Sequence, residues 1–271
     1  IAGDDGIKLR ATNLETGIDL KVEGTIKSDG VVAISASTLR DIASSLSGNG
    51  TLTLEHTGDT VLVSTGNGRS TLKTLAYEDF PTLPLPEAPR AKFELSGSLL
   101  RSLVNAVVPY ASVSTVRPEL ASVLLKSEGS TLTAVATDSF RLAEKKISLA
   151  TPVAEFSMLI PAKNATDIMQ TLPDESIQIS VDEHQCAFFW KKGVITTRLV
   201  TANYPDYTQI IPKAFVSEAT VLKKDFEAAL RRTAIFSDTF QKVRIGFDGE
   251  VKAVALSAQN ADVGDSAESV S

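Results

Sequence analysis

Cysteine and histidine are scarce in this sequence: its 271 residues include one cysteine, Cys186, and two histidines. A single cysteine can form neither an internal disulfide nor a cysteine-ligated metal cluster, so we expect a reducing, cytoplasmic environment and no metal site. No apolar run approaches the roughly 20 residues that a membrane helix needs. No charged segment leads from Ile1 into an apolar core, so no signal peptide is expected. The sequence starts within an expected strand, which suggests a fragment lacking its natural ends.

The few residues that could catalyse a reaction have simpler interpretations. His56 and His184 lie in alternating strand contexts, where an outward-facing surface residue is expected. The glycine-rich GNGRS (66–70) lacks the spacing of a phosphate-binding loop, so it predicts a hairpin turn.

The candidate carboxylates are also better explained by structural roles in turns than by metal binding or catalysis. GDDG (3–6) lacks the later oxygen ligands of a calcium loop. Asp138 and Asp206 could form an acid pair, but both stand at chain corners, where a carboxylate accepts backbone N–H groups. We therefore predict no catalytic residues and no cofactor, with an enzyme that uses scattered carboxylates kept as an alternative.

The formal net charge of −6 argues against a protein that coats nucleic acid with its whole surface. The charges are nevertheless separated. Basic residues gather on expected helices, whereas acidic residues gather in turns and at strand ends. The helical basic residues are Arg40, Arg101, Lys163, Lys223, Lys224, Arg231 and Arg232. One basic face could thus meet phosphates.

Alternating apolar residues predict many short strands separated by tight turns. The clearest are residues 31–35, 51–57, 60–65, 70–75, 122–127, 131–137, 176–182, 186–192 and 194–200. Apolar residues three and four apart predict helices at 37–46, 98–108, 162–172 and 223–236. This pattern predicts an α+β fold with antiparallel sheets.

The chain repeats itself with a period of about 125 residues. Asn13 and Asp138 occupy similar corners 125 residues apart, and the Phe80-Pro81 pair recurs 124 residues later as Tyr204-Pro205. The helices around Leu39 and Ala165 align with an offset of 126 residues. Solenoid repeats have only about 20–50 residues, so the period indicates duplication of a whole domain.

Proline-rich segments mark the boundaries of the repeats. We expect three domains: 1–91, containing only the second half of a repeat; 92–216, a complete repeat; and 217–271, containing only the first half.

Four motifs together resemble the bacterial beta sliding clamp, the processivity subunit of DNA polymerase III. They are RPEL (117–120), ATDSFRLA (136–143), IPAK (160–163) and YPDYTQIIP (204–212). The resemblance covers essentially the whole chain. It implies repeated domains of the DNA clamp fold, with sheets outside and helices lining the inner face. Two such chains form a homodimeric ring around duplex DNA.

The resemblance implies sequence-independent contacts between inner helices and phosphates, which suit a ring that slides. The candidate DNA-binding residues are Arg101, Arg117, Lys163, Lys224 and Arg232. A nucleoid-associated protein in the cytoplasm is expected.

The resemblance also implies a pocket for short peptides, roughly Gln-Leu-Ser/Asp-Leu-Phe, of the clamp loader and of replicative and repair DNA polymerases. An apolar pocket with a few polar groups suits such anchors. The residues carried over are Leu120, Thr137, Ser139, Phe140, Arg141, Leu142, Pro205, Gln209, Ile210 and Phe240. Phe140 replaces a histidine that is common in the family.

For ring closure the resemblance points to Phe80 on one side and to Ile235 and Phe236 on the other. A domain-core role for these three residues is equally open. A β-rich surface or adhesive protein without DNA binding is the second functional class, since repeated hairpins would also suit it.

Overall fold

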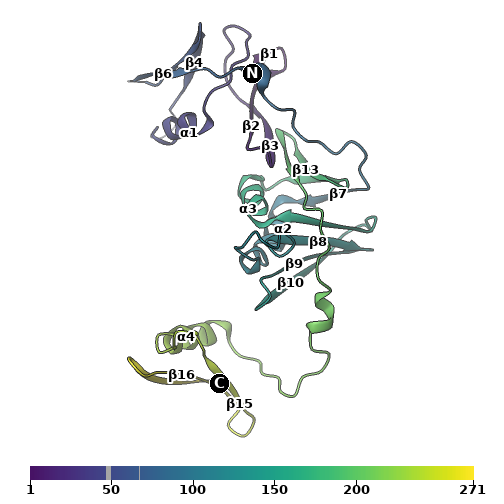
Figure 1. The fold of residues 1–271 in the computed structure, drawn as a ribbon, viewed down its shortest axis with the longest axis vertical. Coiled ribbons are helices and arrows are strands. Elements are labelled where there is room, and N and C mark those ends of the chain that lie inside the picture. Colours follow the sequence, from purple (N-terminus) through teal and green to yellow (C-terminus); the bar gives the residue numbers. More distant parts are fainter. Residues whose placement is uncertain (47–49, 67) are drawn as a thin grey trace. The chain divides into compact units, whose positions relative to one another are not determined.

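The computed structural model describes residues 1–46, 50–66 and 68–271, which form two compact units, Ile1–Pro205 and Asp206–Ser271. Figure 1 shows the elements along the chain. Within the described ranges, no helix is long and apolar enough to cross a membrane. The expected boundary at residue 91 falls within the first unit, because one sheet joins the elements before and after it.

That sheet has seven antiparallel strands in the order β1-β2-β3-β14-β13-β12-β7. Their bounds are β1 Ala2–Gly3, β2 Gly6–Thr12, β3 Thr16–Val22, β7 Ala91–Ser96, β12 Ser176–Val181, β13 Gln185–Trp190 and β14 Gly193–Arg198. The junction is the β3–β14 ladder, in which Ile18 pairs with Ile195. Lys192 reinforces it through an ion pair with Glu23 at 2.8 Å.

A four-stranded sheet, β10-β9-β8-β11, completes the middle of the first unit. It consists of β8 Ser122–Glu128, β9 Thr131–Thr137, β10 Leu142–Ser148 and β11 Phe156–Pro161. Helices α2 Gly97–Asn105 and α3 Ala162–Thr171 pack against each other and against the strands. Their apolar stripes, which include Leu100, Leu103 and Ile168, are at most 1% exposed and form the main core.

Residues 24–80 form a smaller subregion: α1 Ala36–Ser44, β4 Thr53–Thr57, β5 Thr60–Ser64, β6 Arg69–Lys73 and the 3₁₀ turn η1 Tyr77–Asp79. The strand predicted at 31–35 is wrong. Around residues 30–35, the described part of the chain forms only the single bridges of Gly30 with Ala2 and of Ala33 with Leu75, because none of its strands provides a continuous ladder there.

The second unit contains the 3₁₀ turn η3 Tyr207–Ile210, helix α4 Lys223–Ala234, and strands β15 Arg244–Asp248, β16 Ala253–Asn260 and β17 Gly264–Val270. Helix α4 packs on β16 and β17, and the core contains Ala229, Leu256 and Val270. The α+β prediction with antiparallel sheets is confirmed in both units.

The four predicted helices are confirmed, although α2 ends earlier than expected. Pro109 follows closely and has no backbone N–H to continue an α-helix. The chain instead forms the 3₁₀ turn η2 Val108–Tyr110, which lies against β9.

Candidate functional site

The corner between β9 and β10, residues 137–141, holds its shape with its own hydrogen bonds. The Thr137 hydroxyl donates to the Arg141 carbonyl at 2.7 Å and accepts from the Ser139 amide at 3.1 Å. Asp138 Oδ1 accepts from the amides of Phe140 and Arg141, both at 3.0 Å. These two backbone bonds hold the pKa of the Asp138 carboxyl below its usual value. The structural role predicted for Asp138 is confirmed.

The corner presents an aromatic side chain and a cation to solvent. Phe140 is 97% exposed, although its amide is fixed. Arg141 is anchored: its Nε donates to Asp138 Oδ2 at 3.0 Å, and its Nη2 donates to the Pro109 carbonyl at 3.2 Å. Its guanidinium carbon also lies 5.2 Å from the centroid of the Tyr110 ring. The turn η2 therefore supports the corner from outside the hairpin.

The other pocket candidates of the first unit differ in exposure. Leu120 is 4% exposed and Thr137 is 7% exposed, whereas Leu142 is half-buried and Pro205 is exposed. Tyr204 belongs to the same region, since the backbone of Thr137 acts on the titration of its hydroxyl. Burial raises the pKa of Tyr204 to about 12, against the opposite effect of the Thr137 backbone. The tyrosine is therefore neutral at physiological pH.

The remaining three pocket candidates belong to the second unit. Gln209 donates to Asp206 Oδ2 at 2.8 Å, while Ile210 and Phe240 are 70% and 76% exposed. Asp206 also accepts from the amide of Thr208, at 3.2 Å, so its predicted role at a corner is confirmed.

The three basic candidates of the first unit differ in how far they are already engaged. Arg101 on α2 binds groups at the end of α3, including Asp174 at 2.6 Å. Arg117 pairs with Glu119 at 2.9 Å and remains 58% exposed. Lys163 is exposed in the first turn of α3.

On α4 the two basic candidates also differ. Arg232 makes two hydrogen bonds with the Glu268 carboxylate, at 2.8 and 2.7 Å, and these lower the pKa of Glu268. Lys224 is exposed in the first turn. Among the residues that the structure describes, neither Lys163 nor Lys224 forms an ion pair.

The three interface candidates have mixed exposure. Ile235 is 68% exposed at the end of α4, as a contact residue would be. Phe80 and Phe236 are half-buried.

Residues that might have carried chemistry lie in structural positions. Cys186 is fully buried, and burial raises the pKa of its thiol. His56 and His184 are exposed, the latter in a turn and not in a strand. The described ranges contain no group of three or more potential metal ligands. In the GNGRS segment, Asn67 lies outside the described residues.

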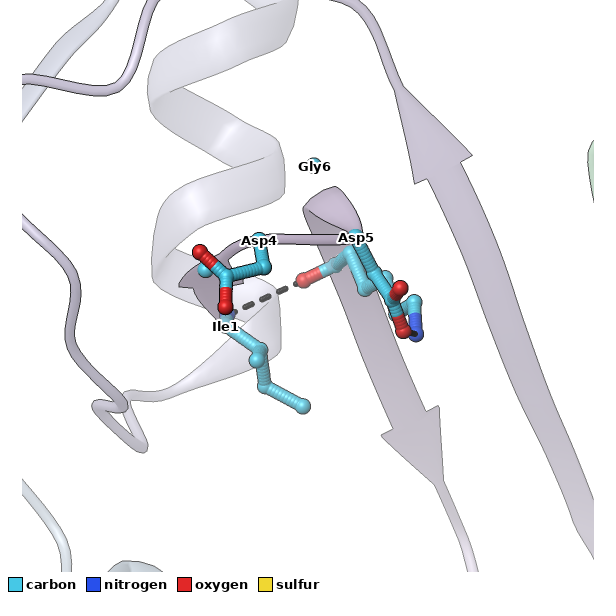
Figure 2. A pocket seen from close by; sticks show the side chains of 6 residues that line it. Ile1, Asp4, Asp5 and Gly6 are labelled. Carbon is cyan, nitrogen blue, oxygen red and sulfur yellow. Dashed lines mark hydrogen bonds and ion pairs between the residues drawn. The ribbon is translucent and has the colours of Figure 1, made fainter.

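The paired carboxylates near the beginning of the sequence form the predicted turn, between β1 and β2. Figure 2 shows the carboxylates of Asp4 and Asp5 pointing to opposite sides of this turn. Asp5 is bound by Lys8 at 3.0 Å. The two carboxylates therefore do not converge on one point as the ligands of a shared cation would.

Comparison with known proteins decides the family. Residues 1–84 match the DNA polymerase III beta subunit, N-terminal domain, and residues 94–206 match the central domain of the same subunit. The beta sliding clamp of Synechococcus elongatus is 30% identical over 276 residues, covering 99% of this chain and 73% of that protein. The Bacillus subtilis clamp is 30% identical over 275 residues, covering 97% and 71%.

The chain belongs to the beta sliding clamp family. The crystal structure of the DNA polymerase sliding clamp from Bacillus subtilis superimposes with a TM-score of 0.88 at 27% identity, covering 99% of this chain and 74% of that one. The expected clamp fold is thus confirmed, and the function is that of a sliding clamp in DNA replication. The alternative of a β-rich surface protein is set aside. A clamp is a processivity factor, which agrees with the expectation of a non-enzymatic protein.

Three contacts of this clamp were not predicted from the sequence: Arg101 with Asp174, Arg141 over Tyr110, and Tyr204 with Thr137. Each joins residues more than 30 positions apart. Arg141 and Tyr204 each belong to a motif, ATDSFRLA and YPDYTQIIP, but nothing in the sequence pointed to their partners or to the partner of Arg101.

Proposed function

We propose that the clamp encloses duplex DNA without reading its sequence, and that Lys163 and Lys224 are its principal phosphate ligands. The observation that carries this proposal is their common position. Each is the second residue of a helix, and each is exposed without an ion pair among the described residues. A lysine in a first turn opposes the helix dipole and costs about 0.3–1 kcal/mol. A phosphate at that point would be attracted by both the ammonium group and the helix end.

The other basic candidates have secondary roles in this proposal. Arg117 and Arg232 are more than half exposed but would have to share their carboxylate partners with a phosphate. Such exposed ion pairs contribute roughly 0–1 kcal/mol, so their exchange for DNA phosphates costs little.

A lysine-to-glutamine series tests the DNA-binding role. Lys163→Gln with Lys224→Gln should weaken duplex binding and reduce the slope of log affinity against log salt by about 0.9 for each phosphate ligand removed. Lys191→Gln is the matched control, because Lys191 is exposed in the β13–β14 turn. Equal salt slopes for the double variant and the control would remove these lysines from the DNA-binding surface.

We further propose that two chains close the ring by pairing β6 of one chain with β17 of its partner. Both are edge strands of three-stranded sheets. The 125-residue offset makes β6 the equivalent of β14, since Thr60 pairs with Lys73 as Gln185 pairs with Arg198. β17 occupies the same hairpin position as β3, and β3 pairs with β14.

Charge and packing support this pairing. β6 carries Arg69 and Lys73, whereas β17 carries Asp265, so the two edges have opposite charges. Phe236 lies beside Gly264 at the start of β17. The predicted interface residues Ile235 and Phe236 would thus adjoin the paired edge, and Phe80 follows β6 closely.

Cysteine cross-linking tests the pairing. Carrying over the β3–β14 register places Ser70 opposite Ser266, at the roughly 4.5–5.5 Å Cα separation that a disulfide accepts. Ser70→Cys with Ser266→Cys should give a covalent dimer under oxidation. Thr71→Cys with Ser266→Cys is the control, since a one-residue shift turns the thiol to the other face. The buried Cys186 should not interfere. Equal cross-linking of the two variants would rule out the proposed register.

For partner binding we propose that the corner 137–141, with Leu120, Leu142 and Pro205, binds short peptides, and that Gln209, Ile210 and Phe240 of the second unit are further peptide-binding residues. Its support is an aromatic side chain that is almost fully exposed on a rigid corner, which is unusual without a partner. The proposed occupants are short apolar peptides of the clamp loader and of replicative and repair polymerases. The three repeated domains, 1–91, 92–216 and 217–271, and the association with the nucleoid belong to the same proposal.

A further inference from the structure

Arg101 is the most thoroughly engaged of the basic candidates. Its Nε donates to the carbonyl of Met169 at 2.9 Å, its Nη2 donates to the carbonyl of Leu172, and its Nη1 binds Asp174 at 2.6 Å. All three guanidinium nitrogens are therefore occupied. The side chain is 30% exposed, about half the exposure of Arg117 or Arg232. A guanidinium held in this way cannot turn to a phosphate without giving up several bonds at once.

The groups that Arg101 binds lie at the carboxyl end of α3. The last carbonyls of a helix have no partner within it, and the helix dipole makes this end negative. A cation that bonds these carbonyls therefore stabilises the helix end. Because Arg101 itself stands on α2, the same bonds tie α2 to α3.

Lys163 stands at the opposite end of α3. The helix has 10 residues and is thus about 15 Å long. Pro161 at its N-cap makes no side-chain capping bond. The first turn of α3 is held by the Ala162 amide, which donates to the Ala121 carbonyl at 2.9 Å, so a loosened carboxyl end would let the helix tilt about this turn and change the direction in which Lys163 projects.

We propose that Arg101 is a positioning residue of the DNA-binding surface: it holds α3 against α2 and so directs Lys163 toward the phosphates, without contacting DNA itself. This inference rests on the proposed role of Lys163. It replaces the prediction that Arg101 binds a DNA phosphate with a role in positioning Lys163.

The salt dependence of DNA binding distinguishes the two roles. Affinity of the full chain for a short fluorescent duplex would be measured by anisotropy at several salt concentrations, well below the melting temperature. Arg101→Gln should lower affinity about threefold in the natural chain but should change neither affinity nor the slope of log affinity against log salt when Lys163 is already Gln, because its effect passes through Lys163. Arg101→Lys should recover part of the affinity, since one ammonium can still bond a carbonyl and Asp174.

Lys163→Gln and Lys191→Gln complete the experiment as a direct ligand and a neutral control. A slope reduced by about 0.9 more when Arg101→Gln is added to Lys163→Gln would make Arg101 a phosphate ligand in its own right and overturn the proposal. A lower melting temperature with unchanged affinity would also overturn it, since the role would then be structural only. An unchanged slope in Lys163→Gln would remove the DNA-binding role of Lys163 and this inference with it. An adverse result in Arg101→Gln alone leaves the role of Lys163 standing.

Discussion

Two corners of this molecule have the same backbone and different surroundings. In the corner between β2 and β3, the Thr12 hydroxyl donates to the Thr16 carbonyl at 2.7 Å and accepts from the Leu14 amide at 3.0 Å. Asn13 Oδ1 accepts from the amides of residues 15 and 16. The corner between β9 and β10 repeats each bond 125 residues later, with Asp138 in place of Asn13. Leu14 and Ser139 even share a positive φ, 74° and 76°.

The two corners differ in whether the strand that follows them pairs with a further strand. After the first corner, β3 is paired with β14, and the Glu15 carbonyl accepts from the amide of Arg198 at 2.9 Å. After the second corner, β10 pairs only with β9 among the described strands. One corner is thus used within the fold, and the other is left with Phe140 exposed. The same hydrogen bonds shape a corner, but the adjacent edge determines whether it is available to a partner.

The largest effect is expected from Leu142→Asp, which changes the first residue of β10, directly after the corner 137–141, and leaves the corner 12–16 unchanged. A carboxylate in an apolar pocket remains charged and unpaired, so binding of a labelled Gln-Leu-Asp-Leu-Phe peptide should fall by about 30-fold or more. Fluorescence polarisation measures this, with a peptide whose Leu and Phe are Ala as the control. Undiminished affinity in the variant would exclude the corner from the pocket.

Matched threonine variants should break the two corners separately. Thr137→Val and Thr12→Val each remove one hydroxyl that makes two hydrogen bonds, at about 1 kcal/mol per bond. Thr137 is buried and Thr12 is half-buried, so the destabilisation should be greater for Thr137. Thermal unfolding should show a melting temperature lower by about 4 °C for Thr137→Val. Peptide affinity should fall only in Thr137→Val. A peptide effect from Thr12→Val would contradict the division of roles.

A second matched pair leaves the backbone intact. Phe140 and Glu15 occupy equivalent positions, and both are exposed. Phe140→Ala and Glu15→Ala should each change stability by less than about 0.5 kcal/mol. Only Phe140→Ala should weaken peptide binding, by roughly fivefold, because the aromatic ring no longer packs on the peptide. Equal peptide affinity of the two variants would show that Phe140 does not touch the partner.

The two corners could be predicted because each depends on residues close together in the sequence. Features that depend on contacts between distant residues could not be predicted in this way. The offset between Asn13 and Asp138 is visible in the sequence because each corner is built from five consecutive residues. The partner of Arg101 is not, since Asp174 lies 73 residues away and is brought near by helix packing. Likewise the alternating residues 31–35 suit a strand, yet a strand also needs a neighbour, which no local pattern guarantees. The candidate peptide-binding residues could be predicted by resemblance only, because no local pattern in the sequence groups them.

The smallest expected effect is a difference in how the two corners respond to acid. It arises because the second corner has Asp138 where the first has Asn13. Bonds from the amides of Phe140 and Arg141 lower the pKa of the Asp138 carboxyl from its usual 3.8. A lowered pKa means that the folded corner favours the ionised form, so its stabilising effect is complete well above pH 3.8 and is lost as the pH falls through the lowered pKa. Asn13 does not titrate. Hydrogen exchange at acidic pH, corrected for its intrinsic pH dependence, should therefore show the amides of Phe140 and Arg141 losing protection while those of residues 15 and 16 keep theirs. Parallel loss at both corners would mean that acid acts on the whole unit and not on Asp138.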